Sequence, residues 1–154
     1  MEPKIRGKMI YLKPITHSNI NDFAGTSYDT MSFKEKQNMI NESRNKIHNE
    51  SYFEFLVVYE NDTIIGFMNL YAHSKHIISC GPAIKEQFQN KGFGFSAETM
   101  ALEYAKDRGY TIAVASVDEN NRSSIALHEK LGFELDRNYF NRQGRDMRLY
   151  IKAL

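Results

Sequence analysis

The stretch Gln89-Asn90-Lys91-Gly92-Phe93-Gly94-Phe95 is the most informative part of this chain. An apolar segment over residues 79–84 enters this polar turn, and residues 96–108, whose apolar side chains recur at helical spacing, leave it. Gly109 then follows two basic residues, as at the end of a helix. The pattern predicts a strand, a glycine-bearing turn and a helix, with a further strand over residues 111–117.

This turn has the features of an anion-binding site. The first N–H groups of a helix have no partner inside the helix, and the helix dipole adds partial positive charge there. Gly92 and Gly94 would let the backbone approach a ligand without a Cβ in the way. Two glycines at a helix start also occur without any ligand. By itself, the turn leaves both a phosphate site and a plain turn open.

Two motifs of the chain resemble those of a known family. Residues Gln89 to Gly94 are similar to the Q/R-x-x-G-x-G/A signature of the GNAT superfamily of acyl-CoA-dependent N-acetyltransferases. Residues Asn121 to Phe133 resemble that family's second signature, in which Asn and Ser lead a helix that ends in K-L-G-F. The opening residues 5–14 resemble the first strand of the branch that includes ribosomal-protein N-terminal and polyamine acetyltransferases.

Length and composition predict an ordinary globular protein. The chain has 154 residues, of which 42% are hydrophobic and 25% charged, so we expect one domain over residues 1–154. The net charge of +1 predicts no nucleic-acid partner. Cys80 is the single cysteine, and the five histidines have no metal-ligand spacing, so we expect neither an internal disulfide nor a metal. Without a long apolar run or a signal-peptide core, a cytoplasmic location and no membrane partner are expected.

The remaining segments predict a mixed, mostly antiparallel sheet. Residues 53–59 and 63–71 form a hairpin, and residues 76–80 continue the meander. We expect Gly81-Pro82 to interrupt that strand, because proline cannot donate to a ladder and glycine often marks a bulge. Residues 133–140 and 146–151 form a closing hairpin.

The resemblance implies the acyl-CoA N-acyltransferase fold, an α/β (α+β) fold. Its central sheet has six to seven strands that splay apart in the middle, with about four flanking helices. It also implies that the interruption at Gly81-Pro82 is a bulge that opens a slot for the pantetheine arm of the cofactor.

Acetyl-CoA is the co-substrate that the resemblance implies. Backbone N–H groups of the glycine turn would hold the pyrophosphate, Lys91 would add positive charge, and the strand around Ile84 would pair with the pantetheine amides and polarise the thioester carbonyl. The expected cofactor-binding residues are Ala83, Ile84, Gln89, Asn90, Lys91, Gly92, Phe93, Gly94, Phe95, Asn121 and Ser124. A solvated loop lysine, a core strand and two helix caps are the alternative interpretations of Lys91, Ile84, Asn121 and Ser124.

His128 departs from the family pattern. Seven residues after the motif asparagine, the family commonly has a tyrosine that protonates the leaving CoA thiolate, whereas this chain has histidine. An imidazole with an ordinary pKa of about 6.5 can donate a proton near neutral pH, so His128 is a candidate general acid. The alternative is that His128 packs beside Leu127 and Leu131, and that the thiolate leaves without assistance.

No motif identifies a general base. An amine acceptor is mostly ammonium at pH 7 and must lose a proton before it attacks a thioester. Ser116 stands where one type of relative has its glutamate, and Cys80 lacks the partners of a catalytic nucleophile. The candidates that remain, each of which also fits a solvated surface residue, are Glu54, Asp118, Glu119, His73 and His76.

The sequence therefore predicts an acetyl-CoA-dependent N-acetyltransferase. A primary amine, on a protein N-terminus, a polyamine or another small molecule, would attack the thioester directly in a ternary complex. The alternative is a catalytically weak or inactive acyl-CoA-binding sensor of the same fold. A nucleotide-binding loop is disfavoured because the turn lacks a G-K-[ST] ending and a G-x-G-x-x-G pattern. The amine and the oligomeric state stay open, and a homodimer fits the fold.

Overall fold

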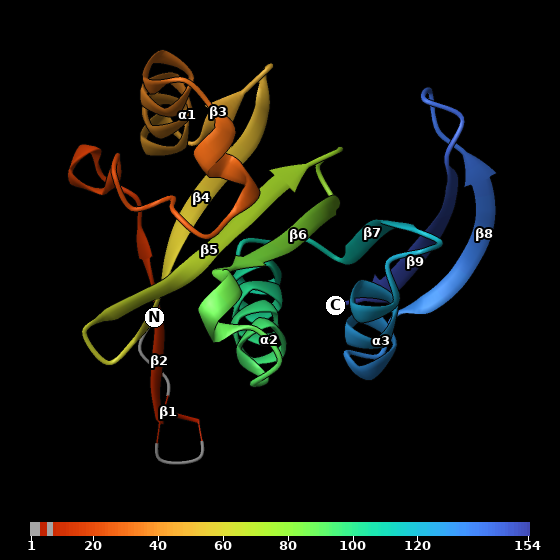
Figure 1. Cartoon of the computed structure of the whole chain (residues 1–154). Helices are drawn as coiled ribbons and strands as arrows, with labels where there is room; N and C mark the ends of the chain where they lie inside the picture. Colours follow the sequence, from red (N-terminus) through yellow and green to blue (C-terminus); the bar gives the residue numbers. More distant parts are fainter. Residues whose placement is uncertain (1–3, 6–7) are drawn as a thin grey trace.

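The computed structural model describes residues 4–5 and 8–154 (Figure 1). The expected first strand over residues 5–14 falls partly on Arg6 and Gly7, which lie outside the described residues. Within the described part, β1 (Lys4–Ile5) pairs antiparallel with β2 (Lys8–Pro14).

In the described part of the chain, eight strands lie side by side in the order β1-β2-β4-β5-β6-β7-β9-β8, and the short β3 pairs with β4 off this path. Every neighbouring pair is antiparallel except β6 and β7, which are parallel. The mixed, mostly antiparallel sheet is thus confirmed, and two-residue strands raise the count above the expected six to seven. The bounds are β3 (Ile47–His48), β4 (Ser51–Glu60), β5 (Thr63–Ala72), β6 (Ile77–Ile84), β7 (Ile112–Asp118), β8 (Glu134–Phe140) and β9 (Asp146–Ala153).

The described residues form three α-helices, where about four helices were expected. They are α1 (Phe33–Asn45), α2 (Phe93–Asp107) and α3 (Arg122–Lys130), and three short 3-10 segments accompany them: His17–Asn19, Ser27–Thr30 and Glu86–Phe88. Ser32 is the N-cap of α1, because its side chain accepts a hydrogen bond from the Glu35 N–H. Figure 1 shows α1 on one side of the sheet and α2 with α3 on the other.

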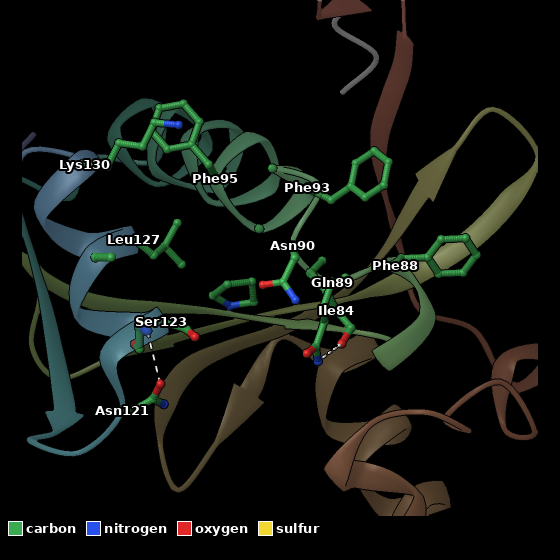
Figure 2. Close-up of a pocket in the computed structure, with 15 residues that line it drawn as sticks. Ile84, Phe88, Gln89, Asn90, Phe93, Phe95, Asn121, Ser123, Leu127 and Lys130 are labelled. Carbon is green, nitrogen blue, oxygen red and sulfur yellow. Dashed lines mark hydrogen bonds between the residues drawn. The ribbon is translucent and has the colours of Figure 1, made fainter.

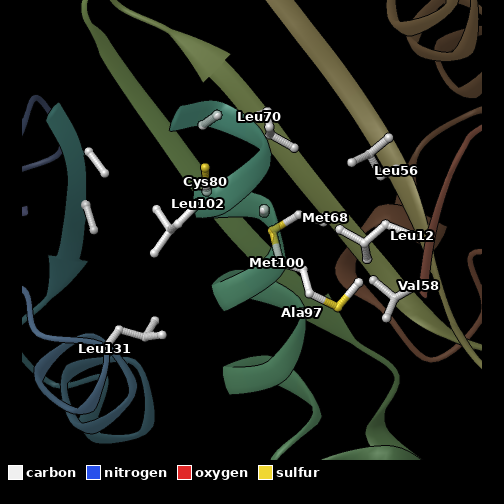
Figure 3. Close-up of a cluster of buried hydrophobic side chains, with 14 of the residues drawn as sticks. Leu12, Leu56, Val58, Met68, Leu70, Cys80, Ala97, Met100, Leu102 and Leu131 are labelled. Atoms are coloured by element: carbon white, nitrogen blue, oxygen red, sulfur yellow. The ribbon is translucent and has the colours of Figure 1, made fainter. Parts of the chain in front are cut away.

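Helix α2 contributes the larger of two cores. Its small and apolar side chains at helical spacing, Ala97, Met100, Ala101 and Ala105, are at most 3% exposed (Figure 3). They pack with apolar residues of the central strands, such as Met68 and Leu70. The short alanine side chains let the helix axis come close to the sheet, so the start of α2 is held at a fixed height above it.

Strand β6 does not break at Gly81-Pro82, so the expected interruption and its bulge are wrong. The register between β5 and β6 runs without a shift from the pair Gly66–Ile84 to the pair Ala72–Ile78, and Pro82 lies opposite Met68. The ladder to β5 tolerates Pro82 when its missing N–H belongs to the other edge of β6, the edge that faces β7.

The expected splay of the sheet is present, and it comes from lost pairing rather than from a bulge. The parallel pairing of β6 with β7 covers only residues 77–79 and 112–114. Both strands continue beyond this contact, β6 to Ile84 and β7 to Asp118, without pairing to each other. Two strand edges therefore face an opening in the middle of the sheet.

Across the described residues, none of the helices is long and apolar enough to cross a membrane. The cytoplasmic location stays a prediction.

Gly66 tests the close contact between β5 and β6. A Cβ added there would lie 2.5 Å from the Ala83 carbonyl oxygen and 2.9 Å from the Ile84 Cα, which are backbone atoms that cannot move aside cheaply. Gly66→Ala should lower the free energy of unfolding by about 1–3 kcal/mol, and the melting temperature should fall. Gly81→Ala is the matched control, because a Cβ at Gly81 meets nothing within 4 Å. Equal melting of the two variants would contradict the contact.

Candidate active site

The glycine turn presents backbone N–H groups at the start of α2. Asn90 and Gly92 have left-handed backbones with φ of 61° and 84°, which reverse the chain between the 3-10 segment and the helix. The hydrogen bond of 3.2 Å from Ser96 N–H to the Gly92 carbonyl opens the helix. The N–H groups of Gly94 and Phe95 precede it and find no acceptor inside α2. Together with the helix dipole, they form a site for an anion.

A cavity of about 620 Å³ lies in front of this turn, between the ends of α2 and α3. Figure 2 shows Asn121, Ser123 and Leu127 of α3 and its cap on one side, with Gln89 and Asn90 facing them. The cavity is lined by Pro82, Ile84, Phe88, Gln89, Asn90, Gly92, Phe93, Gly94, Phe95, Asn121, Ser123, Ser124, Ala126, Leu127 and Lys130. The structure therefore brings together all the expected cofactor-binding residues except Ala83 and Lys91.

Those two residues point elsewhere. Ala83 precedes Ile84 on a strand, so its side chain lies on the opposite face of the sheet. The Lys91 ammonium lies 5.9 Å from the centre of the Phe88 ring, outside the cavity lining. The cation that borders the cavity is Lys130, whose Nζ lies 4.5 Å from the centre of the Phe95 ring (Figure 2).

Several lining residues on α3 were missed from the sequence. Ser123, Ala126, Leu127 and Lys130 share one face of the helix, since they follow one another at spacings of three, one and three residues. That spacing was a usable signal, because it extends the face that Asn121 and Ser124 begin.

Two side-chain hydrogen bonds fix the walls of this cavity. The Gln89 amide Nε2 donates to the Ile84 carbonyl at 3.0 Å, which ties the turn to the end of β6 (Figure 2). The Asn121 Oδ1 accepts from the Ser124 N–H at 3.1 Å, so Asn121 is the N-cap of α3. Capping uses only Oδ1, and the Asn121 Nδ2 is still a donor at the cavity edge.

A second cavity, of about 630 Å³, lies at the opening between β6 and β7. Its lining comes from four neighbouring strands and from α3: Asn69, Tyr71, His73, Ile77, Ser79, Cys80, Gly81, Pro82, Val114, Ala115, Ser116, Val117, Ser124, His128 and Leu149. Pro82 and Ser124 line both cavities. The two cavities therefore meet where the strands separate.

His128 is buried between α2 and α3 and contacts a buried carboxylate that the sequence analysis did not identify. Its Nε2 lies 3.1 Å from Oε2 of Glu98, and the two side chains are 6% and 0% exposed. Its Nδ1 lies 2.7 Å from the Ser124 carbonyl oxygen, which requires the proton on Nδ1. The ring also stands edge-on against Phe133, with centroids 5.0 Å apart.

The pKa of each group lies above its ordinary value, for different reasons. Burial lowers the pKa of His128, but the Glu98 carboxylate and the Ser124 carbonyl outweigh it and hold the pKa above its ordinary value. Burial raises the pKa of Glu98, and the contact with His128 only partly offsets this. Both shifts favour a pair that holds a proton beside the second cavity.

Cys80 lines the second cavity but is not activated. Burial, and then the nearby Glu98 carboxylate, raise the pKa of the Cys80 thiol well above its ordinary value. The thiol is therefore protonated at neutral pH, which is unfavourable for a nucleophile.

The candidate bases lie in different environments. Glu54 is 2% exposed, which contradicts a solvated surface role, and it accepts hydrogen bonds from Tyr52 and Tyr104 at 2.6 and 2.9 Å, away from both cavities. Asp118 lies 3.8 Å from an arginine nitrogen in the turn before β9, and Glu119 lies 3.9 Å from an arginine nitrogen on β9.

The two histidine candidates differ in position. His76 is exposed and outside both cavity linings, whereas His73 lines the second cavity. Over residues 4–5 and 8–154, no group of three His, Cys, Asp or Glu side chains is placed to hold a metal ion.

Comparison with known proteins agrees with this geometry. A family model described as "Acetyltransferase (GNAT) family" matches residues 18–133, which is more than half of the chain. An L-methionine sulfoximine/L-methionine sulfone acetyltransferase of Pseudomonas aeruginosa is 30% identical over 70 residues, which are 46% of this chain and 37% of that protein. The match thus spans well under half the length of this curated relative.

Two solved structures share the fold. A ribosomal-protein-alanine N-acetyltransferase from Brucella melitensis superposes with a TM-score of 0.77 at 17% identity, over 94% of this chain and 99% of that one. A spermidine N-acetyltransferase from Vibrio cholerae, in complex with CoA and spermine, superposes with a TM-score of 0.77 at 16% identity, over 94% and 95% of the two chains.

The Glu98–His128 pair predicts a pH dependence of stability. Both groups bind protons more tightly in the folded state than in the unfolded state, so the free energy of unfolding should fall as pH rises above about 6.5 through the folded pKa of His128. In Glu98→Gln, the carboxylate that raises the pKa of His128 is gone, and this decline should disappear. Chemical denaturation between pH 6 and 9 measures it. A wild-type slope retained in Glu98→Gln would contradict the pairing.

Proposed function

Because the chain belongs to the GNAT family of acetyltransferases, we propose that it transfers the acetyl group of acetyl-CoA to a primary amine. The observation that carries this proposal is the meeting of two cavities at the opening between β6 and β7, with Pro82 and Ser124 in both linings. The first cavity has an anion site at the start of α2, and the second cavity reaches the opening between β6 and β7 from a different side. A thioester and an amine would meet there.

The first cavity would hold the cofactor. The pyrophosphate would accept hydrogen bonds from N–H groups of the glycine turn, and Lys130 would add positive charge at the rim. The pantetheine arm would follow the edge of β6 that Pro82 leaves without pairing to β7, and Asn121 would donate to it through Nδ2. The Ile84 carbonyl already accepts from Gln89, so an N–H rather than this carbonyl would contact the arm.

The second cavity would receive the amine. The relative from P. aeruginosa is named for two amino-acid analogues, and the structural neighbours for a protein alanine and for spermidine. An amine acceptor is the feature that these names share. In our proposal, the amine nitrogen attacks the thioester carbon directly, and the chain acts as one acetyltransferase domain.

His128 would protonate the leaving thiolate. It lines the second cavity near the shared Ser124, and the adjacent Glu98 carboxylate favours its protonated form. A general acid needs a proton at the pH of the reaction, and the pair supplies one. Glu98 would act through His128 and would not touch the substrate.

Isothermal titration with acetyl-CoA tests cofactor binding. A Cβ at Gly94 would point toward Ile84, Leu127 and Pro82, each 3.9 Å away, so a side chain there enters the cavity. Gly94→Asp should weaken binding by about 100-fold or more, because its charge lies beside the phosphates. Gly94→Asn has the same size without the charge and should lose less affinity. Unchanged affinity in Gly94→Asp would remove the site assignment.

A thiol-release assay with a panel of primary amines tests transfer itself. Release with any of the amines would establish the enzyme, whereas binding of acetyl-CoA without release across the panel would favour the acyl-CoA sensor.

The role of His128 predicts a loss of rate without a loss of affinity. His128→Phe keeps a ring of similar size against Phe133 but carries no proton, so kcat should fall by about 10²-fold or more while the Kd for acetyl-CoA stays unchanged. His128→Tyr restores a hydroxyl donor and should recover part of the rate. A wild-type kcat in the phenylalanine variant would show that the thiolate leaves without His128.

A further inference from the structure

We propose that the second cavity selects a primary amine whose neighbouring groups are uncharged, and that Ser79 and His73 take the proton from its ammonium. This inference rests on the proposed acetyl transfer, and it specifies the acceptor and the missing base. It concerns the lining of the cavity between β6 and β7, which three observations describe: its charge, its hydrogen-bonding atoms and the contact of His73.

The lining is mostly apolar, and the described residues that form it include no Asp, Glu, Lys or Arg side chain. Its titratable groups, apart from the buried Cys80 thiol, are Tyr71, His73 and His128, and its other polar side chains are Asn69, Ser79, Ser116 and Ser124. A second ammonium on the acceptor would lose its hydration here without gaining an opposite charge. A carboxylate would meet only the His128 imidazolium, which the Glu98 carboxylate already pairs. An amine attached to amide or apolar groups would lose much less.

Asn69 supplies an acceptor for the amine. Its Oδ1 is buried and has no hydrogen-bond partner among the described residues, although Asn69 lines the cavity. A buried amide oxygen without a partner is costly, and an N–H from the acceptor would relieve that cost. The atom therefore marks the part of the cavity where a donor binds.

His73 is held at the mouth of the same cavity. Its backbone N–H donates to the Ile77 carbonyl at 2.8 Å, which closes the turn between β5 and β6. Its Nε2 lies 2.6 Å from the Ser79 hydroxyl, and its ring stands edge-on to Tyr71 at 5.4 Å. Ser79 lines the cavity further along β6, so the hydroxyl connects the interior to an exposed imidazole.

The surroundings of His73 favour its neutral form. Desolvation lowers the pKa of His73 below its ordinary value, so the imidazole is ready to accept a proton at pH 7. The titratable groups around it are Tyr71 on β5 and, beyond that ring, His48 of β3, which pairs with Glu42 of α1. His128 also lines this cavity, and its partner is Glu98.

The proton steps balance. The acceptor ammonium gives a proton to the Ser79 hydroxyl, which passes its own proton to Nε2 of His73. The free amine attacks the acetyl carbon, the C–N bond forms and the C–S bond breaks. The CoA thiolate takes a proton from His128, and the second amine proton replaces it. His73 then returns its proton to water at the exposed mouth, so one proton is released per acetyl group transferred.

The pH dependence of kcat/KM tests the base, with acetyl-CoA saturating and phenylalaninamide as acceptor. At pH 7, the ammonium of this amide, with a pKa of about 8, needs a base. His73→Gln should lower kcat/KM by about 10²-fold at pH 7, and the loss should shrink toward tenfold at about pH 9.5, where the amine is already free. Ser79→Ala should behave in the same way, and the affinity for acetyl-CoA should not change.

His76→Gln is the matched control, since His76 is exposed and outside the cavity lining. It should keep the wild-type profile. A loss in His73→Gln that is equal at both pH values, no loss at all, or the same loss in His76→Gln would each overturn the role of His73.

Three acceptors of similar shape test the selectivity. Phenylalaninamide carries the reacting amine as its one charged group, phenylalanine has a carboxylate in place of the amide, and lysinamide has a side chain that ends in a second ammonium. Each acceptor is measured at a pH above the pKa of its reacting amine, so that the three do not differ in the protonation of that amine. Under these conditions, kcat/KM should be higher for phenylalaninamide than for either charged acceptor by about tenfold or more. A charged acceptor that reacts equally well or better would overturn the inference and leave the transferase function standing. No transfer to any of the three, with acetyl-CoA bound, would overturn both.

Discussion

The site depends on one missing ladder of hydrogen bonds in the middle of the sheet. Strands β6 and β7 pair over three residues each and then continue without pairing to each other. Pro82 has no backbone N–H to donate to a neighbouring strand. Because the register between β5 and β6 is unbroken, the missing donor lies on the edge of β6 that faces β7. A sheet with this gap has two open edges in its interior. Open edges are normally avoided because they bind other chains, and here they face the two cavities.

The helices place polar groups at this gap. Alanines hold α2 close to the sheet, so the N–H groups at its start face the end of β6, and the cap of α3 stands opposite them. Glu98 and His128 join the two helices from within. A buried ion pair contributes little net stability, because desolvation cancels much of the attraction. Its value here is the position of a proton beside the point where the two cavities meet.

The sequence predicted local features well because their causes are local. The helix after the glycine turn, the Asn121 cap and the hairpin of β4 and β5 follow from short-range backbone chemistry, and each is present. The bulge at Gly81-Pro82 was wrong because a proline is compatible with a continuous strand whenever its missing N–H faces an unpaired edge. Which edge is unpaired depends on β7, some thirty residues later. Glu98 and the burial of Glu54 were missed for the same reason. A carboxylate on a strand or helix is expected to be solvated until the partners that bury it, two tyrosines for Glu54 and one histidine for Glu98, are known.

Amide hydrogen exchange with and without acetyl-CoA tests most directly whether the gap between β6 and β7 is the cofactor slot. The N–H groups on the open edge of β6, within residues 80–84, and those of Gly94 and Phe95 should exchange more slowly when acetyl-CoA is bound, since the pantetheine arm and the pyrophosphate would cover them. The paired β8–β9 hairpin should not change. Slower exchange at another surface, with residues 80–84 unaffected, would contradict the assignment of the slot.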